Sequence, residues 1–147
     1  MNTLKLRLLY TVCAALTAAA CSRQKHIENG LEFRDWILVK PRIAGSGTVA
    51  YGSIRNTSAS ARLLKDVELA CAESAELHET LTDGGRARMA PLGAPTIAAG
   101  ETLVFEPGHK HIMVMRSKPD IGEKCDAVFT FDTATARFAM PVREREK

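Results

Sequence analysis

A short stretch in the C-terminal half of the chain carries side chains that can bind a metal ion. It comprises residues 109–115, with the sequence HKHIMVM. Its aliphatic residues alternate in period two, which predicts a β-strand whose other face carries His111, Met113 and Met115. Most strands fill that face with ordinary polar residues, whereas this one presents an imidazole and two thioethers. These are soft donors, and the combination of thioether and imidazole favours Cu(I).

Two further candidate donors, His78 and Met89, lie upstream in the sequence. His78 and Met89 are separated by ten residues, and Met89 and His111 by twenty-one. Residues 83–85, Asp-Gly-Gly, predict a tight hairpin between the runs that carry His78 and Met89. The hairpin can bring these two side chains together across paired strands, and the strand with His111 and Met113 can join them at one end of a sandwich.

This spacing resembles the His-x10-Met-x21-His-x-Met signature of the PCuAC-type periplasmic copper chaperones. Residues 106–115 also look like the family's Pro-Gly…His-x-Met-x-Met segment, and the resemblance extends over residues 33–142. It implies that four side chains hold Cu(I): His78, Met89, His111 and Met113. Met115 shares the face of Met113 and is expected either to assist as an auxiliary donor or to pack beside the site.

The elements that position these residues are short strands. Turn residues divide the chain into runs that alternate in period two, and helical periodicity is absent, which predicts an all-β, antiparallel β-sandwich. The runs alone leave an immunoglobulin-like and a cupredoxin-like version open, and the resemblance implies the cupredoxin-like one. The expected strands cover residues 33–39, 48–54, 62–70, 75–80, 87–89, 96–98, 102–105, 111–115, 126–131 and 135–142.

The N-terminus has the composition of an export signal. Lys5 and Arg7 precede a short apolar segment that ends in small residues, which predicts a signal peptide over residues 1–20. Cys21 follows three alanines and is expected to become the lipidated first residue of a lipoprotein; cleavage after Ala20 without lipid is the alternative. Residues 21–30 are expected to form a lipidated tether, 31–143 the copper-binding domain, and 144–147 a charged tail. Both alternatives place the protein in the periplasm.

Two cysteines remain in the expected domain, Cys71 and Cys125. They lie in separate strand-like runs and outside any Cys-x-x-Cys motif, so a structural disulfide is favoured in an oxidising compartment. A pair of copper-binding or redox thiols is the alternative.

Net charge excludes some functions. The chain has 20 basic and 17 acidic residues, and removal of Lys5 and Arg7 with the signal leaves a charge of +1. This balance predicts no nucleic-acid partner. No serine, cysteine or carboxylate group falls in a recognisable catalytic arrangement, so an enzyme is not expected.

The resemblance implies a copper chaperone that delivers Cu(I) to the copper centre of cytochrome c oxidase, beside a Sco-type thiol-disulfide protein. We expect a monomer. A copper-sequestering lipoprotein without a dedicated client would use the same four ligands. A β-sandwich scaffold lipoprotein without metal remains a further alternative, and it predicts no tight Cu(I) binding.

Overall fold

The computed structural model describes residues 24–145, and all regular secondary structure in that range is β-strand. Within these residues no helix is present that could cross a membrane. The strands are β1 (Lys25–Glu28), β2 (Leu31–Val39), β3 (Thr48–Asn56), β4 (Arg62–Leu69), β5 (Ala72–Asp83), β6 (Arg86–Pro91), β7 (Thr96–Ile97), β8 (Thr102–Phe105), β9 (Lys110–Ser117), β10 (Lys124–Phe131) and β11 (Thr135–Arg143). The predicted all-β class is confirmed.

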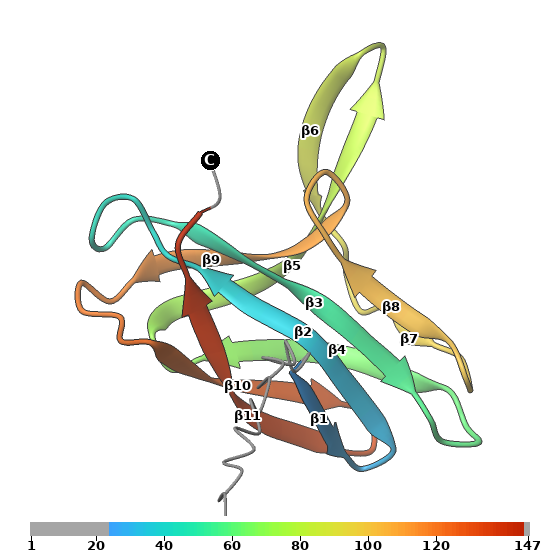
Figure 1. Cartoon of the computed structure of the whole chain (residues 1–147). Coiled ribbons are helices and arrows are strands. Elements are labelled where there is room, and N and C mark those ends of the chain that lie inside the picture. Colours follow the sequence, from blue (N-terminus) through green and yellow to red (C-terminus); the bar gives the residue numbers. More distant parts are fainter. Residues whose placement is uncertain (1–23, 146–147) are drawn as a thin grey trace, which may run out of the picture.

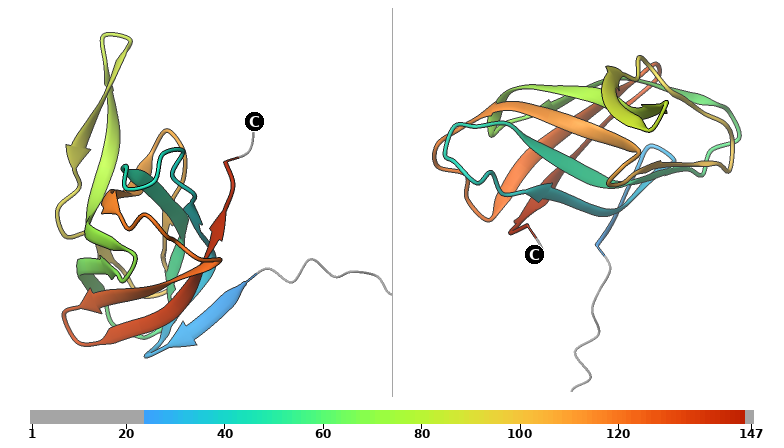
Figure 2. Two further views of the ribbon diagram at one scale, coloured as in Figure 1. Left: turned by 90° about the vertical axis from the view of Figure 1, so that its left-hand side faces the viewer. Right: turned by 90° about the horizontal axis from the view of Figure 1, so that it is seen from above.

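The strands form two layers around one core (Figures 1 and 2). One layer has the order β6-β5-β9-β3-β2, with β1 paired to β2 and β8 to β3; the other has the order β11-β10-β4-β7. A short parallel pairing of β11 with β2 connects the layers, where Val142 lies opposite Leu38. The other pairings among the described strands are antiparallel.

Aromatic side chains fill the space between the layers. Trp36 on β2 packs against Phe129 on β10 with ring centroids 4.9 Å apart, and its indole N–H donates to the carbonyl of Ser53 at 3.0 Å. Position 52 must be glycine because a Cβ there would lie 2.3 Å from Cδ2 of Trp36. Burial of such large rings supplies much of the hydrophobic stabilisation of a small domain.

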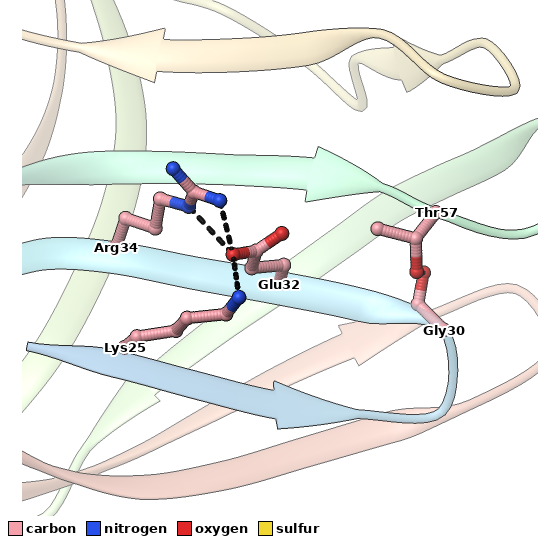
Figure 3. Close-up of polar contacts among 5 residues, drawn as sticks. All are labelled: Lys25, Gly30, Glu32, Arg34 and Thr57. Carbon is pink, nitrogen blue, oxygen red and sulfur yellow. Dashed lines mark hydrogen bonds and ion pairs between the residues drawn. The ribbon is translucent and has the colours of Figure 1, made fainter.

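The expected tether is partly wrong, because residues 25–28 form strand β1 of the domain. β1 pairs with β2 through a two-residue turn at Asn29 and Gly30, both with positive φ, as an Asn-Gly hairpin requires. Glu32 receives an ion pair from Lys25 at 2.7 Å and a hydrogen bond from Arg34 Nε at 2.6 Å (Figure 3). The lipidation site, Cys21, and the signal peptide lie outside the described residues.

The same charged cluster affects the titration of Glu32. Only 4% of this residue is exposed, but the side chains that cover it are those of Lys25 and Arg34, not apolar side chains of the core. The hydrogen bond from Lys25 therefore outweighs desolvation and lowers the pKa of Glu32. The carboxylate consequently ties β1 to β2 in its charged form.

The β5–β6 hairpin stands out from the sandwich as an arm (Figures 1 and 2). Its turn is formed by Gly84 and Gly85, both with positive φ, and the first pair next to the turn joins Asp83 to Arg86. The hairpin predicted from Asp-Gly-Gly is confirmed. At the C-terminus, Glu144 of the expected charged tail forms an exposed ion pair with Lys40 at 2.7 Å.

Candidate metal centre

The two histidines of the predicted site lie side by side on neighbouring strands. His78 on β5 is directly opposite His111 on β9, and their ring centroids are 5.9 Å apart. Ile112 and Leu77 point into the core from these strands, so the two imidazoles project from the outer face. The sheet register therefore brings together two nitrogen donors that are 33 residues apart in the sequence.

The ring of His78 has one nitrogen engaged and one free. Its Nε2 lies 2.9 Å from a carboxylate oxygen of Glu76 and donates to it, while Nδ1 is buried and has no hydrogen-bond partner among the described residues. The side chain is only 13% exposed. The contact with Glu76 favours the tautomer whose Nδ1 lone pair is available to a metal ion.

The ring of His111 shows the same arrangement with the opposite nitrogens. Its Nδ1 lies 3.1 Å from the carbonyl oxygen of His109, and since a carbonyl can only accept, Nδ1 carries the proton. Nε2 is buried and finds no partner within residues 24–145, and the residue is 4% exposed. An unpaired buried nitrogen is costly, so its persistence on two facing rings is an observation that a bound ion would explain.

The two methionines share this face but do not meet the imidazoles equally. Met113 lies opposite Glu76 on β5, and its methyl carbon is 3.7 Å from where a Cβ on Gly47 would lie. Met89 lies opposite Thr80 on the hairpin arm, two residues along from the partner of His78, so it is a diagonal neighbour of His78. Its side chain is 61% exposed. Diagonal neighbours in a sheet are within reach of long side chains. The register thus places all four predicted ligands on one face. The two histidines are directly opposite each other, whereas each methionine lies in a neighbouring row.

Met115 is farther from the imidazoles. It is half-buried on the same face, opposite Ser74 and two residues beyond Met113. Ser74 is two residues before Glu76, so Met115 lies in the row next to that of Met113 on this face and two rows from His111.

Cys71 and Cys125 are joined by a disulfide with a Cα–Cα distance of 5.7 Å. The bond connects the turn between β4 and β5 to β10, and both cysteines are buried. Because both sulfurs are consumed in this bond, neither is a free thiolate that could compete with the thioethers for copper.

The sequence alone did not identify Glu76 as a partner of the site. Glu79, the immediate neighbour of His78, does not face the imidazole, because adjacent residues in a strand point to opposite faces. Glu79 lies opposite Lys110 and Ala90 instead. The strand period would have pointed to Glu76, two residues before His78. In the described residues 24–145, His, Cys, Asp and Glu side chains form no group of three able to hold a metal, so a site here depends on the thioethers.

Comparison with known proteins identifies the family. Residues 31–142 match the family described as "Putative lipoprotein LpqE-like". The chain belongs to this LpqE-like family. A "Putative lipoprotein" of Leifsonia xyli subsp. xyli (strain CTCB07) is 33% identical to it over 140 residues, which cover 91% of this chain and 82% of the relative.

Solved structures share the fold of this LpqE-like chain. The "Copper-bound PCuAC domain from PmoF2" aligns with a TM-score of 0.67 at 13% identity, over 83% of this chain and 99% of that domain. Apo-DR1885 from Deinococcus radiodurans aligns with a TM-score of 0.58 at 25% identity, over 99% of this chain and 97% of that protein. These structures confirm the cupredoxin-like sandwich and the resemblance to PCuAC domains that the His/Met spacing predicts.

Proposed function

We propose that this protein is an extracytoplasmic Cu(I)-binding metallochaperone that holds copper through His78, Met89, His111 and Met113. The observation that supports it best is the pair of buried, unpartnered ring nitrogens, Nδ1 of His78 and Nε2 of His111, on directly opposed residues. Each ring is oriented through its other nitrogen, and metal-binding histidines in proteins are usually held in this way.

The donor set favours Cu(I) over other ions. Thioether sulfur is soft and uncharged, whereas structural zinc sites use thiolates and catalytic ones usually add carboxylates or a third histidine. An electron-transfer copper site needs a cysteine thiolate, and the two cysteines of the described domain are bound to each other. Holding and passing on the ion is the chemistry that the remaining ligands serve, so we propose a carrier and not an enzyme.

The thioethers support transfer rather than permanent storage. Met89 is 61% exposed on the hairpin arm, and a weak ligand at the surface can be exchanged for a ligand of a partner protein. The proposed client is the copper centre of cytochrome c oxidase, and a Sco-type protein is the proposed second partner. The lipoprotein description of the family and of its relative supports a membrane-anchored, extracytoplasmic location, and we propose Cys21 as the lipidated residue.

The decisive experiment is an anaerobic Cu(I) titration against a competing chromogenic chelator. The protein is residues 21–147 with Cys21→Ser, which prevents acylation, and the variants are His111→Ala and Met113→Ala. One tight equivalent that is lost in both variants is the expected result. No tight equivalent in the parent chain would refute the chaperone and favour a metal-free scaffold.

Transfer separates delivery from sequestration. Loaded protein is mixed with the soluble copper domain of an oxidase, and the copper on each is measured after separation. The rate is decisive, because the final distribution depends only on the two affinities: a chaperone transfers copper to the domain faster than it releases copper to a small chelator, whereas a sequestering lipoprotein transfers it no faster than by spontaneous release.

A further inference from the structure

His109 occupies a defined place beside the proposed copper site, although the PCuAC-type spacing does not include it. The backbone N–H of Thr80 donates to the carbonyl of His109 at 3.1 Å. This bond continues the β5–β9 pairing one residue beyond Glu79 and Lys110, so His109 lies opposite Thr80. Met89 lies opposite Thr80 on its other side. The three residues thus form one row across β6, β5 and the start of β9.

This row lies next to the row of the two buried imidazoles and on the same face. Thr80 is two residues from His78, and His109 is two residues from His111, and strand alternation places residues two apart on one face. Two strand spacings, about 10 Å, separate the backbones of Met89 and His109. Their long side chains extend from either side of the small Thr80, and both can reach an ion above it.

Exposure changes sharply from one row to the next. The side chain of His109 is 71% exposed and Met89 is 61% exposed, whereas His78 is 13% exposed and His111 only 4%. An ion that arrives from water therefore meets the thioether of Met89 and the imidazole of His109 before it can reach the buried nitrogens.

The backbone of His109 is fixed but its ring is not. Its carbonyl oxygen accepts from His111 Nδ1 and from the backbone of Thr80, whereas among residues 24–145 the ring nitrogen Nε2 is held only by a 3.9 Å contact to Glu106. The imidazole can rotate without disturbing the bond that orients His111. This separation also makes His109→Ala a clean substitution, because the carbonyl that serves the site remains.

We propose that Met89 and His109 form a surface capture site through which Cu(I) enters and leaves the buried pair. The inference rests on the proposed copper-chaperone function. Met89 keeps its bond to copper while the nitrogen of His109 is exchanged for those of His78 and His111. The ion stays Cu(I), so no electrons are transferred, and the receiving nitrogens are the unprotonated ones, so no proton has to leave.

The test compares rates with affinity. Residues 21–147 with Cys21→Ser, the His109→Ala variant and a control variant, His26→Ala, are mixed with a Cu(I)–chelator complex in a stopped-flow instrument. Loading is followed by the loss of chelate absorbance, and release is followed after mixing with excess chelator. His26 lies on β1, and it interacts with Glu28 and Phe138 rather than with the site.

We expect His109→Ala to slow loading and release by about tenfold each, which corresponds to about 1.4 kcal/mol of barrier, and to leave the dissociation constant within about threefold. The His26→Ala rates stay at the parent values. Unchanged rates in His109→Ala overturn the capture site, and so does a tenfold loss of affinity, which would make His109 a permanent ligand. A parent chain that binds no Cu(I) tightly overturns the proposed function as well, so the two failures are distinguishable.

Discussion

The disulfide between Cys71 and Cys125 should supply a large part of the stability of this domain. The two residues are 54 positions apart, and the closed loop contains β5 to β9 with all four proposed copper ligands. Opening the loop gives the unfolded chain more conformations without changing the folded contacts, so the free energy of unfolding falls.

The size of the effect follows from the loop length. A loop of this size corresponds to about 4 kcal/mol at 25 °C in the chain-entropy treatment. Replacement of both cysteines by alanine also removes two buried sulfur atoms, which adds about 1–2 kcal/mol of lost packing. With a urea dependence of about 1.5 kcal/mol per M, the loop contribution alone corresponds to a midpoint shift of about 2.7 M.

Urea unfolding separates the two contributions. The oxidised protein, the protein reduced with a phosphine, and Cys71→Ala/Cys125→Ala are unfolded in parallel and followed by tryptophan fluorescence, which reports on Trp36. The reduced protein keeps both sulfurs, so its difference from the oxidised form measures the cross-link. A loss below about 1 kcal/mol on reduction would refute the reasoning, since the loop ends would then be held together without the bond.

Three further substitutions have defined outcomes. Gly52→Ala forces a Cβ against Trp36 and should lower the free energy of unfolding by about 3 kcal/mol, measured as a fall in the urea midpoint. Glu32 has a lowered pKa in the folded state, so its charged carboxylate stabilises the fold fully above its ordinary pKa of 4.5. This stabilisation is lost as the pH falls through the lower pKa of the folded state. Glu32→Gln should therefore make the free energy of unfolding fall less steeply with decreasing pH on the acid side. Glu76→Ala should weaken Cu(I) binding by about 10- to 100-fold in the chelator competition, while Glu79→Ala on the other face leaves the affinity unchanged.

The parts of the fold that follow from local periodicity could be predicted. Period two in residues 111–115 places His111 and Met113 on the face away from the core, and in the structure the alternate residues Ile112 and Val114 belong to the core cluster. The Asp-Gly-Gly turn gives the β5–β6 hairpin. β1 was not predicted because residues 22–30 are polar, although the Asn29-Gly30 pair is itself a strong hairpin signal.

The depth of the site could not be predicted in the same way. Alternation gives the face of His78 but not its 13% exposure, which depends on how neighbouring strands pack around it. The exposure of Met89 depends on whether another layer covers the hairpin arm, and no local pattern encodes that. The contact of Glu76 with His78 could have been found from the strand period.

The early start of β1 limits how far the domain could extend from a lipid on Cys21. If Cys21 carries the lipid, only four Cα steps lead to Lys25, which span at most about 14 Å, whereas a ten-residue tether would span about 35 Å. β1 and the β5–β6 arm lie at opposite ends of the molecule (Figure 1). The lipid would therefore hold the end that carries β1 at the bilayer surface, and the β5–β6 hairpin, which carries the proposed copper ligands His78 and Met89, would extend at the opposite end. A partner that projects well above the bilayer, or one dissolved in the aqueous compartment, could reach those ligands directly, whereas one buried in the lipid could not.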